Sequence, residues 1–250
     1  MRRHRLRSVV RCARSISKQY FKRFKIQYEF WKHYSRFYNT PVKPFRLIWV
    51  NPQDIREGLP LRKTEYSPEG YAILGGNWDL KSIPLMEMDP RFRSLVAHFK
   101  DKIPWEMTEL FQDVMERINL NDEHWHHCKS REDVIRRCQY LDNLFRFIES
   151  VGYKTQNELF GRGLKGYIGR RSARVIPETN EIQVNIGRTG KLLFVNGIHR
   201  LAIVYSIEIT VIPVNVLIRH ELWQQLRDKI GGNKKRVDSN LYNHHPDLCI

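Results

Sequence analysis

The sequence predicts an α+β fold, in which a mixed sheet with helices is preceded by a mostly helical region and a basic N-terminal helix. Apolar residues recur at helical spacing through residues 1–40 and again over residues 90–155. After about residue 180 this spacing changes to the alternation and short apolar runs that are typical of strands. A hydrophobic fraction of 41%, with 12% aromatic residues, is sufficient for a packed core.

Composition divides the chain into four segments. We expect a basic arm at 1–40, a loop-rich and then helical region at 41–155, an α+β domain at 156–232 and a polar tail at 233–250. No apolar run approaches the roughly 18–20 residues that cross a bilayer. Four scattered cysteines without C-x-x-C spacing argue against a disulfide scaffold or a four-cysteine zinc site. We therefore expect a cytoplasmic protein.

The basic character of the chain belongs to the arm. Residues 1–46 contain 14 of the 43 Lys and Arg residues and one acidic residue, so they carry +13 of the formal charge of +16. This amphipathic helix has three alternative roles. The first is to bind the phosphates and bases of nucleic acid, and the second is to lie on an anionic membrane surface. The third is to cover the body of the protein while its charges stay in water. The second role would place the protein peripherally at the inner membrane face.

The second segment contains signals for a strand, a turn and two helices. We expect a short strand over residues 45–50 and a tight turn, GGNWD at 75–79, that positions a tryptophan. Pro104 suits the first residue of a helix that runs through WEMTELFQDVMERI. Ser130 suits the cap of a longer helix, which Gly152 ends.

The third segment predicts a hairpin, a helix, a strand and a final helix. The stretches are EIQVNI (181–186), KLLFV (191–195), HRLAIVYSI (199–207), VIPVNVLI (211–218) and RHELWQQLRDKI (219–230). Before them, Thr155 and Glu158 have the spacing of a capping box, which opens the short helix TQNELF.

The corner FVNGIHRLAI joins the second strand of the hairpin to a helix. The first turn of a helix has unpaired N–H groups and a partial positive charge, and both attract anions. Gly197 would let a ligand approach the backbone closely. Arg200 would offer a planar fork to phosphate oxygens, and His199 would donate a hydrogen bond or a proton. The alternative is an ordinary loop, in which the His-Arg pair satisfies local carbonyls and a carboxylate.

The stretch VNIGRTGKLLFVNGIHRLAIVYSIEITVIPVNVLIRH resembles the ParB/sulfiredoxin-like superfamily. Domains of that superfamily carry a strand, a D/N-G-x-H-R corner, a helix and an iPv.V strand, and the similarity covers about residues 175–230. The resemblance implies a nucleotide-phosphate site at Asn196, Gly197, His199 and Arg200. It also implies ATP or ADP as the ligand, with CTP as an alternative, and Mg²⁺ bridging the phosphates.

Departures from the family pattern narrow the expected activity. Ile198 stands where a sulfiredoxin carries its reactive cysteine, so we do not expect a sulfiredoxin. About twenty residues follow Ile230, too few for the helix-turn-helix of chromosome-partition proteins. Asn196 replaces the first acid of the corresponding box in the free-serine kinases of the family, which weakens that similarity.

The function expected from the resemblance is an ATP- or ADP-dependent phosphotransferase or nucleotide hydrolase. His199 and Glu158 would be its catalytic residues, since such chemistry needs a carboxylate near the phosphates. Gln156 would contact the small-molecule acceptor, and Arg188, in the hairpin turn, would reach the same phosphates.

Several alternatives stay open beside this function. Glu178 and Glu181 are further candidates for the carboxylate, although each is more often a solvated surface acid. A non-catalytic protein is the alternative function: a bound nucleotide would act as a switch, and the basic arm would dock on nucleic acid, as in ParB, or on an anionic membrane. No metal site is expected, because the cluster HWHHCK at 124–129 lacks the separated, paired knuckles of structural zinc sites.

Overall fold

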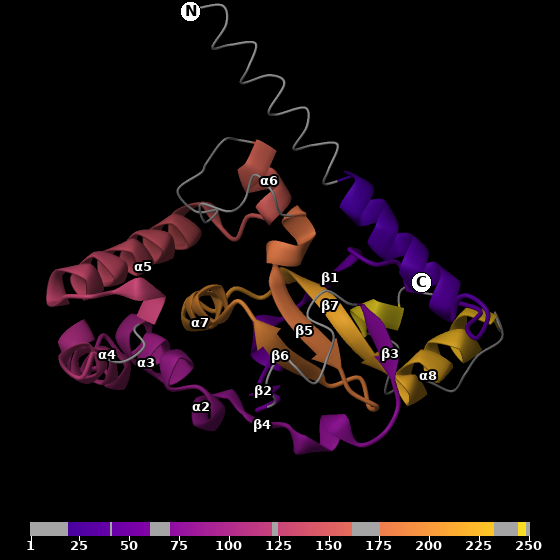
Figure 1. Cartoon of the computed structure of the whole chain (residues 1–250), viewed down its shortest axis with the longest axis horizontal. Helices are drawn as coiled ribbons and strands as arrows, with labels where there is room; N and C mark the ends of the chain where they lie inside the picture. The colour runs from indigo at the N-terminus through magenta and orange to yellow at the C-terminus, as the bar shows by residue number, and fades with distance from the viewer. Residues whose placement is uncertain are drawn as a thin grey trace, which may run out of the picture.

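The computed structural model describes residues 20–40, 42–60, 71–121, 125–161, 176–232 and 245–248. A mixed sheet lies at the centre with helices around it (Figure 1), which confirms the predicted α+β class. The strands are β1 (Leu47–Val50), β2 (Glu57–Gly58), β3 (Ala72–Leu74), β4 (Ile83–Pro84), β5 (Ile182–Ile186), β6 (Leu192–Asn196) and β7 (Ile212–His220). The helices are residues 20–34, α2 (Leu85–Met88), α3 (Pro90–Phe99), α4 (Glu109–Asn119), α5 (Arg131–Val151), α6 (Gln156–Gly161), α7 (Ile198–Ser206) and α8 (Glu221–Gly232).

Strand β7 connects the parts of the sheet. The strand order is β1-β7-β5-β6-β2-β4, and β3 also pairs with β7. β7 runs antiparallel to β1, with Asn215 opposite Leu47, and parallel to β5 and β3. β5 and β6 form the predicted antiparallel hairpin. Strands from both sides of residue 156 therefore share one sheet.

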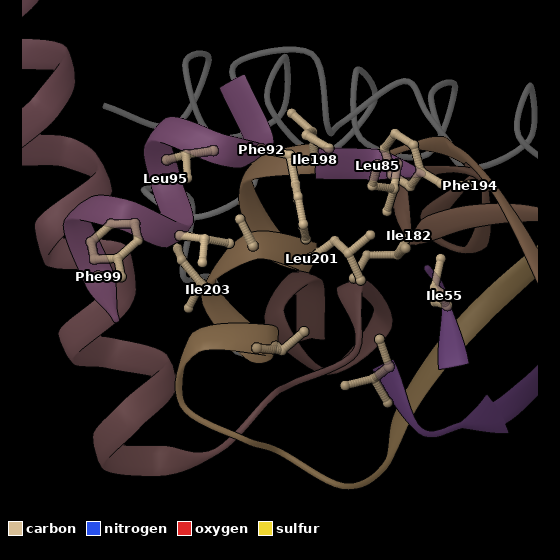
Figure 2. Close-up of a cluster of buried hydrophobic side chains, with 14 of the residues drawn as sticks. Ile55, Leu85, Phe92, Leu95, Phe99, Ile182, Phe194, Ile198, Leu201 and Ile203 are labelled. Carbon is tan, nitrogen blue, oxygen red and sulfur yellow. The ribbon is translucent and has the colours of Figure 1, made fainter. Parts of the chain in front are cut away.

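Helix α7 lies between the sheet and a layer formed by α3, α4 and α5 (Figure 1). Its side chains Leu201, Ala202 and Ile203 have 0% exposure and belong to the same core as Ile182 of β5 and Leu95 of α3 (Figure 2). Buried apolar residues, Ile198 and 201–204, are distributed around the helix, so other elements must enclose it. This enclosure fixes the position of the first turn of α7, where the sequence places the phosphate site.

The helix of residues 20–34 packs on the body. Phe30 belongs to an apolar cluster with Phe45, Tyr71 and Ile73, and the indigo helix in Figure 1 lies beside the sheet. The described half of the arm is therefore helical, as predicted, whereas residues 1–19 lie outside the described residues. Within the described residues, no helix is both long enough and apolar enough to cross a membrane.

Local capping signals explain most of the helix boundaries. The Ser130 hydroxyl accepts a hydrogen bond from the Asp133 N–H at 3.3 Å, and Gly152 follows the last residue of α5 with a φ of +75°, as predicted. The prediction that Pro104 begins a long helix was wrong. Pro104 precedes a single 3₁₀ turn, η4 (Trp105–Met107). Thr108 caps α4, because its hydroxyl accepts a hydrogen bond from the Phe111 N–H.

Residues 245–248, the described part of the predicted polar tail, lie against the body. Residues 245–248 include the 3₁₀ turn η8 (Pro246–Leu248), and Asp247 in this turn is 3% exposed. Its carboxylate bonds to the guanidinium groups of Arg219 in β7 and Arg227 in α8, at 2.6 Å and 2.7 Å. An aspartate between two buried arginines holds this part of the tail against the body.

Candidate anion site at the start of helix α7

Strand β6 passes into α7 through Gly197, which has a left-handed φ of +97°. A Cβ atom at this position would lie 3.1 Å from Cα of Ile182 in the neighbouring strand. Asn196 turns back so that its Oδ1 accepts a hydrogen bond from the Gly197 N–H at 2.9 Å. The left-handed φ and the approach of β5 therefore explain the glycine at this position. Gly197 has no side chain to cap the first turn of α7.

Arg200 points into a buried polar network. Its guanidinium donates to the Tyr153 hydroxyl at 3.0 Å and to the Asn180 carbonyl, and it lies 3.6 Å from Oε2 of Glu181. Burial raises the pKa of the Glu181 carboxyl, and the charge of Arg200 offsets part of that effect. The Arg200 guanidinium, which was expected to bind phosphate, thus forms its contacts with groups inside the protein.

Gln156 joins the same network. Its backbone N–H donates to Oε1 of Glu181 at 2.5 Å, and its side-chain oxygen accepts a hydrogen bond from Asn180 at 2.8 Å. Glu158 closes the predicted capping box, because its carboxylate accepts bonds from the Thr155 N–H and hydroxyl, both at 2.8 Å. The structure thus brings Gln156 and Arg200 together, as expected, but through structural hydrogen bonds.

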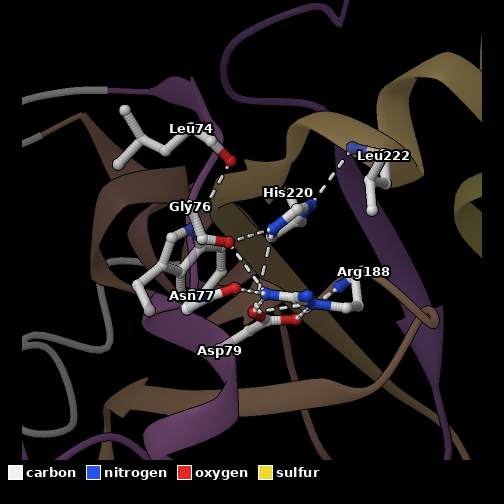
Figure 3. Close-up of polar contacts among 8 residues, drawn as sticks. Leu74, Gly76, Asn77, Asp79, Arg188, His220 and Leu222 are labelled. Carbon is white, nitrogen blue, oxygen red and sulfur yellow. Dashed lines mark hydrogen bonds and ion pairs between the residues drawn. The ribbon is translucent and has the colours of Figure 1, made fainter.

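Arg188 lies at the other end of the hairpin. Each strand of the hairpin has five residues, so at about 3.3 Å per residue the turn is roughly 15 Å from Gly197. The Arg188 guanidinium bonds to the Asp79 carboxylate at 2.8 Å and to the Gly76 carbonyl at 2.8 Å (Figure 3). The expectation that Arg188 reaches the same ligand as His199 is therefore wrong.

The Arg188 cluster instead anchors the predicted GGNWD turn. Burial acts to raise the pKa of Asp79, but hydrogen bonds from Arg188 outweigh it and lower that pKa. His220, at the end of β7, also bonds to the Gly76 carbonyl at 2.9 Å and lies against the ring of Trp78 (Figure 3). The turn positions Trp78 as predicted. Arg188, Asp79 and His220 hold this turn in place, which explains their presence by structure.

The His199 side chain lies outside the Arg200 network and contacts the helical layer. Its ring centroid lies 5.3 Å from that of His126 and 6.0 Å from that of Trp125. Both belong to the short turn η5 (Trp125–His127) that precedes α5. Arg137 of α5 donates to Nε2 of His126 at 3.1 Å, and its guanidinium lies 5.7 Å from the Trp125 ring centroid. Three elements thus meet at the start of α7.

Three buried nitrogen atoms of this cluster lack a hydrogen-bond partner within the described part of the chain: Nε2 of His199, Nε1 of Trp125 and Nε of Arg137. Leaving one buried polar group unsatisfied costs about 1–3 kcal/mol. Native structures contain few such groups, so three in one place favour a ligand that accepts hydrogen bonds.

The charged groups around His199 are mainly positive. Burial lowers the pKa of His199 well below its usual 6.5, and the positive charges of Arg137 and Arg91 lower it further. Burial and Arg137 lower the pKa of His126 to about 4. Arg91 is paired with Asp89 at 2.6 Å. Arg137 bonds to His126 and forms no ion pair with a carboxylate among the described residues. An anion would therefore find a guanidinium without a counter-charge.

The η5 turn adopts backbone conformations that are rare for residues other than glycine. His126 and His127 have φ values of +50° and +62°. Each such residue costs roughly 1–3 kcal/mol, and strain of this kind gathers at functional sites. The turn directs Trp125 and His126 at His199. Among the described residues, no three His, Cys, Asp or Glu side chains are placed to share a metal ion.

A surface pocket of about 440 Å³ adjoins the cluster. It shares Trp125 with the cluster, and Arg91, Val114 and Met88 also line it. Three carboxylates also line the pocket, and each is paired with an arginine: Asp89 with Arg91, Glu109 with Arg93 and Asp113 with Arg117. A cavity of this size accommodates a small organic molecule beside the indole ring.

Sequence reasoning located His199 but missed Trp125 and Arg137, which come from other elements. As sequence, HWHHCK fits a polar loop before the Ser130 cap better than a metal motif, and neither interpretation points to an anion site. Arg137 shares the half-exposed side of α5 with ordinary surface charges. No protein-family model, curated protein or solved structure matches this chain. The evidence for function is therefore the geometry of the site itself.

Proposed function

We propose that the protein binds the phosphate groups of a nucleotide, ATP or ADP, at the start of α7. The observation that carries this proposal is the set of three unpartnered buried nitrogen atoms on His199, Trp125 and Arg137. Phosphate oxygens accept the hydrogen bonds that these groups can donate, and the first turn of α7 adds free N–H groups and a favourable dipole. Arg137 replaces Arg200 as the charged group that contacts phosphate.

The adjoining pocket supports a nucleotide over free phosphate. The Trp125 indole lines this pocket of about 440 Å³ and offers a flat surface against which a base can stack. CTP is a smaller alternative to ATP in the same pocket. We also propose that residues 175–230 form a ParB/sulfiredoxin-like domain; the hairpin, the left-handed Gly197, α7 and β7 support it.

Binding is favoured over phosphoryl transfer. Transfer needs a carboxylate to accept a proton or to hold Mg²⁺ near the phosphates. Glu158 closes the capping box and Glu181 lies in the Arg200 network. The dominant charges around His199 are cationic. The carboxylates of the adjoining pocket, Asp89, Glu109 and Asp113, are each neutralised by an arginine. These residues do not fit a Mg²⁺ site, so we propose the non-catalytic, nucleotide-switched function rather than the phosphotransferase or hydrolase.

The test is calorimetric titration of the full chain with ATP, ADP, CTP and inorganic tripolyphosphate. Arg137→Met should weaken ATP binding by roughly 10- to 100-fold, since a hydrogen bond to a charged group contributes about 1.5–3 kcal/mol. The melting temperature of the ligand-free variant should not fall, because methionine keeps the packing and removes an uncompensated charge. Arg146→Met, on the exposed side of the same helix, is the matched control.

Equal ATP affinity in the wild type and in Arg137→Met would overturn the site. Tripolyphosphate binding as tight as ATP binding would contradict the role of the adjoining pocket. Release or transfer of phosphate from ATP that is lost with Arg137→Met would overturn the non-catalytic assignment in favour of the phosphotransferase or hydrolase.

A further inference from the structure

The helix of residues 20–34 has an exposed aromatic side that its packing leaves uncovered. Phe30 is 5% exposed and faces the body, whereas Tyr20, Phe24, Tyr28 and Trp31 are 70%, 65%, 46% and 60% exposed. At about 100° per residue these four side chains fall within one arc of roughly 80°. We call them the aromatic stripe.

The stripe is continuous along the helix axis. The ring centroids of Phe24 and Tyr28 are 6.2 Å apart, and those of Tyr28 and Trp31 are 6.3 Å apart. Phe21, which is 71% exposed, widens the stripe at its N-terminal end. Contiguous apolar surface of this kind is uncommon on soluble proteins and marks a site of interaction.

Basic side chains lie along one border of the stripe. Lys25 and Lys32 are exposed and lie roughly 90° around the helix from its centre, and Arg36 follows in the next turn. Glu29 is the acidic residue of this row. Residues 1–19 add seven Lys and Arg residues and no acid. The partner of this surface must therefore present negative charge beside an apolar layer.

We propose that the aromatic stripe and its basic border dock the protein on an anionic lipid bilayer. The helix that carries the stripe lies at the edge of the molecule (Figure 1). Its aromatic rings are exposed, so a flat surface can contact all of them together. Tyrosine and tryptophan favour the boundary between headgroups and acyl chains. Lysine and arginine beside them pair with anionic headgroups.

Shape favours a bilayer over single-stranded nucleic acid. Proteins that bind single strands combine stacked bases with a positively charged groove that follows the backbone. Here the aromatic rings protrude from the helix, and the other border of the stripe is the body of the protein. The proposal does not rest on nucleotide binding, because His199 and Arg137 lie in a different part of the fold.

The test is co-sedimentation of the full chain with vesicles of phosphatidylcholine alone or mixed with phosphatidylserine. We expect binding to the mixed vesicles, weakened by salt. Trp31→Ala and Phe24→Ala should each lower it roughly tenfold, which is the effect of losing one buried aromatic ring. Trp49→Ala, which removes a 55% exposed tryptophan from β1, is the matched control and should bind normally. Arg137→Met should also bind normally.

Three results would overturn the proposal. The first is equal vesicle binding by the wild type and both stripe variants. The second is absence of binding to mixed vesicles. The third is retention of a single-stranded oligonucleotide, or dimerisation of the chain, that Trp31→Ala abolishes while vesicle binding is unaffected. The emission of Trp31 is obtained by subtracting the spectrum of Trp31→Phe from that of the wild type. A shift of this emission to shorter wavelength when vesicles are added would place Trp31 itself in the lipid.

Discussion

At the scale of single residues, the hydrogen bond between Arg137 and His126 fixes a protonation state. A guanidinium group donates hydrogen bonds and accepts none, so Nε2 of His126 must accept this bond and carry no proton. The lowered pKa of His126, about 4, agrees with that geometry. His199, buried beside the same guanidinium, has its pKa lowered in the same direction and by the same two causes.

This state predicts a loss of stability in acid. The unfolded chain protonates His126 near pH 6.5, whereas the folded chain resists protonation down to about pH 4. The contribution is complete above pH 6.5 and is lost as the pH falls from 6.5 to 4. Because part of the His126 ring is in water, we expect a loss of about 1 kcal/mol from this residue.

Urea unfolding at pH 7 and at pH 5 measures the effect. His126→Gln should flatten the dependence of the unfolding free energy on pH over this range. His33→Gln, an exposed histidine in the N-terminal helix, should leave the dependence as it is in the wild type. An unaltered slope in His126→Gln would contradict the assigned protonation state.

The sequence predicted individual residues best where their partners are close in the chain. Ser130, Gly152 and the Thr155–Glu158 box act within three or four residues, and all were confirmed. Arg188 and Arg200 were assigned to a ligand because their partners, Asp79 and Glu181, are brought to them only by the folded chain. The local sequence pattern does not predict which of several possible acceptors a long side chain will bind.

At the scale of elements, the junction of β6 and α7 depends on backbone geometry at Gly197. An alanine there would have both a left-handed φ and a Cβ atom 3.1 Å from a backbone atom of β5. We expect Gly197→Ala to lower the unfolding free energy by about 2–3 kcal/mol. Gly76→Ala separates the two causes, since Gly76 has a φ of +83° and nothing lies within 4 Å of its Cβ position.

Chemical denaturation of both variants gives the comparison. Gly76→Ala should cost about 1 kcal/mol, which is the conformational part alone. Equal losses in the two variants would show that β5 yields to the added methyl group. If the proposed phosphate site is correct, Gly197→Ala should also bind ATP more weakly, because the first turn of α7 would move with the corner.

Element types followed from periodicity, whereas element partners did not. The hairpin, α7, β7 and α8 were all predicted from the change of period after residue 180. The pairing of β1 with β7 and the contact of η5 with α7 join segments that are far apart in sequence. The predicted start of a helix at Pro104 was wrong for a local reason, because Thr108 is the better cap.

At the scale of the whole molecule, Asp247 holds the C-terminal part of the chain on the body. Its carboxylate accepts bonds from Arg219, Arg227 and the indole N–H of Trp223, the last at 3.0 Å. Removing one member of a buried ionic cluster leaves the remaining charges uncompensated. Asp247→Asn should therefore lower the unfolding free energy by about 3–5 kcal/mol.

Thermal unfolding followed by circular dichroism checks this expectation. Asp113→Asn breaks an exposed pair with Arg117 within one helix and is the control, with an expected change of about 0.5 kcal/mol or less. A similar small change for Asp247→Asn would show that the tail contributes little to the stability of the fold.

The central position of β7 also orders events during synthesis. Leu47 in β1 cannot pair with Asn215 in β7 until Asn215 leaves the ribosome, 168 residues later. At roughly 5–20 residues per second this delay is about 10–30 s. Until then β1, β3 and β5 lack the strand that joins them, so a nascent chain stalled before residue 212 presents unpaired strand edges to chaperones.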